Sequence, residues 1–124
     1  MPRPFRANRF EQHALNFQNR PRQLNKPLIE HIVLFRWIDA ATEEAKNNVV
    51  TELRKLKGKI PGIVDLSCGA NFSDRAKGYT HGLVVRFTDR AVLQAYGPHA
   101  EHQRVVQNLI KPIAADILAL DYEI

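Results

Sequence analysis

Residues 79–102 read YTHGLVVRFTDRAVLQAYGPHAEH, and the rest of the chain can be arranged around this stretch. Its first part, residues 79–88, is rich in apolar and β-branched side chains and predicts a strand. Asp89 can cap a short helix that runs to about Tyr96, and Gly97 ends it. A strand carrying one His is therefore followed by a helical region carrying a Tyr and two more His residues.

A second helix is expected directly after this short one. Pro98 suits the first turn of a helix, and the apolar spacing continues to about Ala115. Pro112 lies inside this segment and removes a backbone N–H, so we expect a kink or an early end near Lys111.

Three more strands are predicted outside the central stretch, at residues 29–38, 63–70 and 117–124. Between the first two, an apolar stripe predicts a helix from a cap at Asp39 to about Lys57. The order β-α-β-β-α-β predicts an α+β, ferredoxin-like domain with a four-stranded antiparallel sheet and helices on one face. We assign this domain to residues 28–124.

The predicted sheet has an apolar face that its own helices cannot cover. The first and third strands are apolar on both sides, yet helices lie on one side only. A second copy of the sheet is the simplest cover, so we expect a homodimer joined sheet to sheet, forming a dimeric α/β barrel. The uncovered face is expected to contain Ile32, Leu34, Val84, Val64, Leu66 and Cys68.

The formal charge of +5 is concentrated at the N-terminus. Residues 1–27 hold six basic residues and one acid, whereas residues 28–124 hold 12 of each. The domain itself is therefore neutral, and we do not expect a nucleic-acid surface on it. Residues 1–27 also contain four prolines and lack periodicity, which predicts a basic, flexible arm.

A single cysteine, Cys68, fits a reducing compartment, and no apolar run is long enough to span a membrane. The expected location is cytoplasmic. The Arg-rich, acid-poor N-terminus keeps an organelle transit peptide open as an alternative.

The candidate functional residues are histidines and aromatic residues. On the last helix His102 begins an apolar stripe and should point at the sheet, with His99 near the edge of the same face. On the strands, His31 and His81 have the parity of buried neighbours. If the two strands pair in register, up to four imidazoles could converge at one end between helices and sheet. Tyr79 and Tyr96 would accompany them.

Other interpretations of these residues differ in strength. A single buried His that hydrogen-bonds a neighbour is usually structural, whereas several together favour a function. His99 and His102 have metal-ligand spacing, but no carboxylate clearly joins them, so we expect no metal. No nucleophilic triad and no Gly-rich phosphate loop is present, so no cofactor is expected.

Five segments of the chain together form a specific pattern. They are His31-Ile-Val-Leu-Phe, Lys59-Ile-Pro-Gly62, Lys77-Gly-Tyr-Thr-His81, Tyr96-x-x-His99-x-x-His102 and Leu118-Ala-Leu-Asp-Tyr122. On these segments, residues 29–124 resemble the stress-responsive dimeric α/β-barrel domain family (Dabb). The family usually has His-Pro-Ala-His in the fourth segment, whereas here Pro98 precedes His99. The family's fold is a ferredoxin-like protomer whose sheet packs on that of a second copy.

The resemblance also implies a candidate activity. One plant branch of the family, olivetolic acid cyclase, closes a linear polyketide by an aldol step in a pocket between helices and sheet. Its catalytic Tyr and His match Tyr96 and His102, and two further pocket histidines match His81 and His31. The chain is therefore expected to be either a cofactor-free cyclase or lyase, or a non-catalytic, stress-related dimer.

The expected site has two groups of residues. His102 is the general base, with Tyr96 and His81 as polar partners that stabilise an enolate oxygen. A small hydrophobic or aromatic ligand is expected to lie against the other side chains. These substrate-binding candidates are His31, His99, Tyr79, Phe35 and Trp37. A wide pocket would favour the enzyme, and one filled by Trp37, Phe35 and Tyr79 would favour the non-catalytic dimer.

Overall fold

A computed structural model describes residues 27–124 of the chain. The basic arm predicted at the N-terminus lies outside the described residues, apart from Pro27. Within residues 27–124, no helix is long and apolar enough to cross a bilayer.

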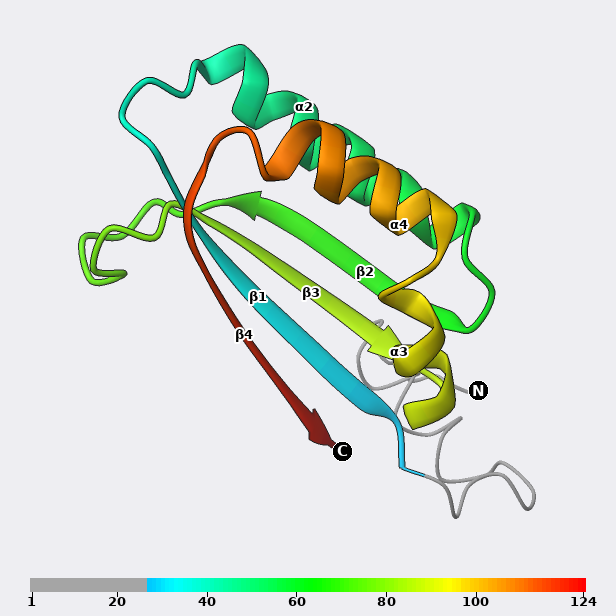
Figure 1. Ribbon diagram of the computed structural model, residues 1–124. Coiled ribbons are helices and arrows are strands. Elements are labelled where there is room, and N and C mark those ends of the chain that lie inside the picture. Colours follow the sequence, from blue (N-terminus) through cyan, green and yellow to red (C-terminus); the bar gives the residue numbers. More distant parts are fainter. Residues whose placement is uncertain (1–26) are drawn as a thin grey trace, which may run out of the picture.

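The domain is an antiparallel sheet with helices on one face (Figure 1). The strands are β1 (Ile29–Trp37), β2 (Ile63–Ala70), β3 (His81–Phe87) and β4 (Ala114–Glu123), in the spatial order β2-β3-β1-β4. The helices are α2 (Glu43–Arg54), α3 (Arg90–Tyr96) and α4 (Ala100–Val105), with a 3₁₀ turn at Lys55–Gly58 and a π-helical turn at Val106–Ile110. This is the predicted ferredoxin-like α+β fold.

In Figure 1, α2 and α4 lie side by side across one face of the sheet, and α3 sits at the end of the sheet where β3 finishes. The helix α2 starts later than predicted. Thr42, not Asp39, is its N-cap, and the Thr42 hydroxyl accepts a 3.0 Å hydrogen bond from the Ala45 N–H. The two glutamates that follow favour the positive end of the helix dipole, which explains why the helix begins there.

The segment after α4 ends early, as Pro112 led us to expect. The α-helix gives way to a π-helical turn that finishes at Ile110, and β4 begins at Ala114. Because Pro112 has no N–H, the helical hydrogen-bond ladder cannot continue through it. The last strand is therefore longer than the predicted 117–124.

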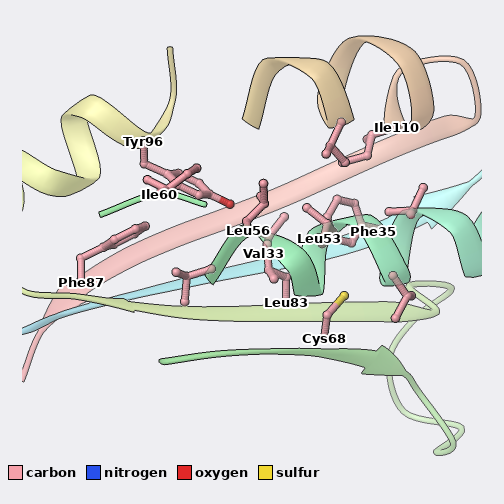
Figure 2. Close-up of a cluster of buried hydrophobic side chains, with 14 of the residues drawn as sticks. Val33, Phe35, Leu53, Leu56, Ile60, Cys68, Leu83, Phe87, Tyr96 and Ile110 are labelled. Carbon is pink, nitrogen blue, oxygen red and sulfur yellow. The ribbon is translucent and has the colours of Figure 1, made fainter. Parts of the chain in front are cut away.

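The core fills the space between the helices and the sheet (Figure 2). Strand residues of one parity point into it: Val33 and Phe35 from β1, and Leu83, Val85 and Phe87 from β3. Leu53 and Leu56 meet them from the helix side at 1% and 0% exposure. Protein cores packed to this degree resist changes of even one methylene group.

The opposite face of the sheet, which we call the outer face, has no helix over it. Its centre consists of apolar side chains paired across three strands, with Ile32 opposite both Val84 and Leu120, and Leu34 opposite Leu118. Leu118 and Leu120 are 49% and 50% exposed, and Tyr122 is 45% exposed. An exposed apolar patch of this kind marks an interaction surface.

For two residues of β2, the predicted face of the sheet was wrong. Cys68 pairs with Leu83 and Leu66 pairs with Val85, so both belong to the helix-covered face, and Cys68 is part of the core. A register shift between Ile63 and Asp65 moves the rest of β2 by one residue relative to β3. Such a shift exchanges the two faces of a strand, and it is invisible in the alternation of the sequence.

Candidate functional site

Four elements bring polar side chains together at the end of the sheet where β3 finishes. His31 comes from β1, Tyr96 ends α3, His102 lies on α4 and Asp121 lies on β4. The Tyr96 ring is the centre of this group. Its centroid lies 4.2 Å from that of His102 and 5.7 Å from that of His31. We call these four residues the ring cluster.

Two helix caps fix where the ring cluster forms. Asp89 caps α3 by accepting a 3.0 Å hydrogen bond from the Val92 N–H, which sets the rotation of the helix that ends in Tyr96. His99 caps α4, because its Nδ1 accepts a 3.1 Å hydrogen bond from the Glu101 N–H. His99 therefore has a structural partner of its own at the edge of the cluster, and it positions the helix that carries His102.

The His102 ring is held in one tautomer. Its Nδ1 lies 2.9 Å from the Gly97 carbonyl oxygen, which can only accept, so Nδ1 carries the proton. The lone pair on Nε2 is therefore free to take a proton. Burial lowers the pKa of His102 below its usual 6.5, and the positive charges of His31 and His99 lower it further, against the Gly97 bond. At neutral pH this imidazole is in the basic form.

His31 and Asp121 form a second pair in the ring cluster. The two residues lie directly opposite each other in the β1–β4 register, and His31 Nδ1 donates to Asp121 Oδ1 at 2.5 Å. The carboxylate fixes the orientation of the ring. The His31 side chain is 14% exposed and that of Asp121 is 43% exposed, so this side of the cluster reaches solvent.

Asp121 was absent from the predicted site. A signal for it was available in the sequence, because the alternation of β4 places Leu118, Leu120 and Tyr122 on one face. Asp121 must then lie on the other face, which is the face of His31.

Tyr96 is buried, at 2% exposure. Its hydroxyl has no hydrogen-bond partner within residues 27–124. Figure 2 shows the ring leaving the end of α3 with its hydroxyl directed into the apolar cluster. Burial raises the pKa of Tyr96 well above its usual 10, with a smaller contribution from Cys68, so the phenol stays protonated and can act as a donor. An unsatisfied buried hydroxyl lowers the free energy of unfolding by about 1–3 kcal/mol. The Tyr96 hydroxyl is therefore a candidate functional group.

His81 does not join the ring cluster. The β1–β3 register pairs His81 with Phe35, whereas His31 pairs with Val85 four positions along the strand. At about 3.4 Å per residue the two imidazoles are separated by most of the sheet's length. The predicted convergence of four imidazoles is therefore wrong, because antiparallel pairing sends the two histidines to opposite ends.

At its own end of the sheet, His81 is held by aromatic neighbours. Trp37 Nε1–H donates to His81 Nδ1 at 2.9 Å, and Thr80 Oγ1 lies 2.9 Å from the same nitrogen. Phe35 stacks on Trp37 with ring centroids 5.2 Å apart. Burial, followed by the charge of Lys46, lowers the pKa of His81, so it is a neutral part of the core.

Tyr79 lies outside the space between helices and sheet. Its hydroxyl donates to the Asp116 carboxylate, and the Arg36 guanidinium lies 5.8 Å from its ring centre. The structure thus gathers His31, Tyr96 and His102 of the predicted site residues, leaves His99 at the margin, and separates Tyr79, His81, Phe35 and Trp37. Among residues 27–124, no three His, Cys, Asp or Glu side chains gather as a metal site would require.

Comparison with known proteins identifies the family. Residues 29–124 match the family model described as the Stress responsive A/B Barrel Domain, Dabb, and the chain belongs to this family. Its fold and its place in this family agree with the resemblance seen in the sequence.

Two curated relatives from Arabidopsis thaliana match the same region, and both are stress-response A/B barrel domain-containing proteins. One is 31% identical over 96 residues, which cover 77% of this chain and 36% of the relative. The other, DABB1, is 31% identical over 99 residues, covering 77% of this chain and 46% of the relative. The chain thus spans less than half the length of either relative.

Solved structures share the fold. A dimeric ferredoxin-like protein of unknown function from Thermobifida fusca is 30% identical, with a TM-score of 0.72, covering 80% of this chain and 92% of that one. A hydroxynitrile lyase from Passiflora edulis has a TM-score of 0.72 at 20% identity, covering 79% of this chain and 94% of the other.

Proposed function

We propose that the chain forms a homodimer and that the ring cluster is a cofactor-free acid–base site for a small carbonyl compound. The observation that carries this proposal is the buried Tyr96 hydroxyl, which has no partner within residues 27–124, on a ring whose centroid lies 4.2 Å from that of His102, an imidazole with its Nε2 lone pair available. A donor and a base placed together are what proton abstraction next to a carbonyl needs.

The proposed step moves one proton. His102 Nε2 takes a proton from the carbon next to the carbonyl, and the C–H electron pair moves into the carbonyl to give an enolate. The Tyr96 O–H donates a hydrogen bond to the enolate oxygen. The enolate carbon then attacks a second carbonyl carbon of the substrate, as in an aldol cyclisation, and the alkoxide oxygen formed there takes the proton from the His102 imidazolium.

His31 and Asp121 line the solvent side of the cluster. The Asp121 carboxylate fixes the orientation of the His31 ring, which can then contact a bound ligand. His81 takes no part in this step, because it lies at the other end of the sheet.

Relatives give this proposal its chemical class. The similarity to the olivetolic acid cyclase branch rests here on Tyr96, His102 and His31, which the structure gathers. The Passiflora neighbour is a hydroxynitrile lyase, and its fold is the one shared with this chain. Both names favour reactions at a carbonyl carbon, and neither fixes a substrate for this chain.

A second candidate function is a non-catalytic, stress-related dimer. The observation that favours it is the packing around the ring cluster, since Tyr96 is almost fully enclosed and Trp37 and Phe35 fill the other end of the space. In that case the unpartnered hydroxyl is a tolerated defect of the core.

The outer face supports the dimer in either case. Ile32, Leu34, Val84, Leu118 and Leu120 form one apolar surface without a helix over it. The Thermobifida neighbour is described as dimeric. A single cysteine allows no disulfide within the chain, which favours a cytoplasmic location.

Deuterium exchange tests the acid–base proposal. Acetophenone, a small aromatic ketone, is incubated with the protein in D₂O, and loss of its methyl proton signal is followed by NMR. With the wild type, the methyl protons of acetophenone should exchange faster than in buffer alone. His102→Ala should lower this catalysed exchange rate about 100-fold. Tyr96→Phe should slow it as well.

The matched control is His99→Ser, which removes an imidazole and keeps an oxygen that can cap α4. It should exchange at the wild-type rate. No acceleration by the wild type for acetophenone or for larger aryl ketones would favour the non-catalytic dimer.

A further inference from the structure

The outer face has a hollow where two glycines lie side by side. Gly69 on β2 pairs with Gly82 on β3, and Gly82 pairs with Leu34 on β1. A Cβ built on Gly69 would meet no described atom within 4 Å, and one on Gly82 would approach Leu34 at 3.7 Å. Both glycines have ordinary backbone angles, so no left-handed conformation requires them. Their effect is to leave space above the sheet.

This hollow has the size and lining of a small-molecule site. Its volume is about 500 Å³, within the range of ligand pockets. Leu34 and Val84 form its floor beside the glycines, and Phe72 and Tyr79 contribute aromatic side chains at its edge. Ser67 adds one hydroxyl on the same face. An apolar hollow with a few polar groups suits a small aromatic molecule.

The loop that forms one wall of the hollow is held by hydrogen bonds. Residues 71–80 connect β2 to β3, and the Asn71 N–H donates to the Thr80 carbonyl oxygen at 2.7 Å. The Tyr79 hydroxyl donates to Asp116 on β4, which ties this loop across the sheet. Phe72, in contrast, is fully exposed. A large aromatic side chain without cover, beside an apolar hollow, is a surface on which a flat ring can stack.

We propose that the hollow at Gly69 and Gly82 is a binding chamber for a small, neutral aromatic molecule, separate from the ring cluster. The two sites lie on opposite faces of the sheet, because His31 has the parity of the core and Leu34 has that of the outer face. Closure of the chamber depends on the proposed dimer, because a second copy packed on this face would cover the hollow. It does not depend on the acid–base chemistry.

Fluorescence of N-phenyl-1-naphthylamine, a neutral aromatic dye that brightens in apolar sites, tests the chamber. The full chain should bind one dye per protomer with saturation. Gly69→Leu fills the hollow without strain and should weaken the dye's Kd roughly tenfold or more. Phe72→Ala, at a fully exposed position that cannot unfold the domain, should also weaken binding. Gly58→Leu adds the same side chain at another open glycine and should leave the Kd unchanged.

Sedimentation and acetophenone exchange of the same variants separate this proposal from the proposed function. Gly69→Leu should still catalyse exchange at the wild-type rate, because Gly69 lies on the face away from His102. Wild-type affinity in Gly69→Leu, or no saturable binding by the wild type, would overturn the chamber, whatever the exchange assay shows. A Gly69→Leu chain that sediments as a monomer and still binds the dye as the wild type does would overturn it too.

Discussion

The Tyr96 side chain places a polar atom among apolar ones. Its hydroxyl points into the core, and no group of residues 27–124 accepts its proton. Groups of this kind persist where function requires them, at a cost in stability. That cost can be measured.

Tyr96→Phe should leave the free energy of unfolding unchanged or raise it by about 1 kcal/mol, because it removes an unsatisfied hydroxyl and keeps the ring. Urea denaturation of wild type and variant at equal concentration measures the difference. Tyr122→Phe, which changes the same group at an exposed position on the outer face, is the matched control. A loss of more than about 1 kcal/mol on Tyr96→Phe would mean that the hydroxyl does have a partner.

His102 should make stability depend on pH in a defined direction. Its folded pKa lies below the usual 6.5 of the unfolded chain, so the unfolded state binds more protons between these two values. Stability is therefore fully present above 6.5 and declines as the pH falls toward the folded pKa. His102→Gln should reduce that decline, measured as the difference in urea midpoint between about pH 7.5 and pH 5.5. An unchanged decline in this variant would show that His102 titrates normally.

At the level of elements, the ring cluster depends on two short helices. The helix α3 has seven residues and carries Tyr96 at its end, so its cap has a large share in its stability. Asp89 is that cap. This cap could be predicted from the sequence, because an Asp directly before an apolar run and a Gly directly after the run mark the two ends of a helix.

Asp89→Ala should lower the free energy of unfolding by about 1 kcal/mol, the usual value for loss of a cap. Asp89→Asn keeps a capping oxygen and should cost much less. If Tyr96 depends on α3 for its position, Asp89→Ala should also slow acetophenone exchange more than Asp89→Asn does. Equal stabilities of the two variants would show that the cap contributes little.

The sequence predicted those features of the fold that depend only on residues close together in the chain. The strand and helix order, the α3 cap and the early end before Pro112 follow from local propensity and geometry. The predicted start of α2 was wrong, because both Asp39 and Thr42 can cap, and the two glutamates that favour the positive end of the helix dipole directly follow Thr42. The position of His81 was also wrong. Which end of an antiparallel pair a residue reaches is set by register, and register depends on the partner strand.

At the level of the whole molecule, the outer face is the surface through which we propose that two copies assemble. Its apolar centre is bounded at one end by an ion pair, in which Arg86 donates to Glu30 through Nε at 3.0 Å and Nη2 at 3.2 Å. At the other end, Arg36 lies 3.8 Å from Asp116. Apolar surface with a charged rim is the usual anatomy of a protein interface.

Leu120→Glu should convert the dimer to a monomer. Leu120 is 50% exposed in the protomer, so the carboxylate is solvated there, but a sheet-to-sheet dimer would bury it without a partner. Sedimentation should give about twice 14.2 kDa for the wild type and about 14.2 kDa for the variant. Ile117→Glu, at 44% exposure on the other face of β4, is the control and should stay dimeric. A wild-type chain that sediments as a monomer would contradict the proposed dimeric barrel.

If a carbonyl ligand reaches Tyr96 and His102 between the helices and the sheet, NMR signals of the imidazole rings will report its binding. Acetophenone is titrated into the protein at about pH 7, and the ring signals of His31, His81, His99 and His102 are followed. We predict saturable shifts at His102 and His31, little change at His81, and loss of the His102 shift in Tyr96→Phe. Unchanged signals at His102 and His31 up to the solubility limit of acetophenone, and of larger aryl ketones tested in the same way, would contradict this prediction.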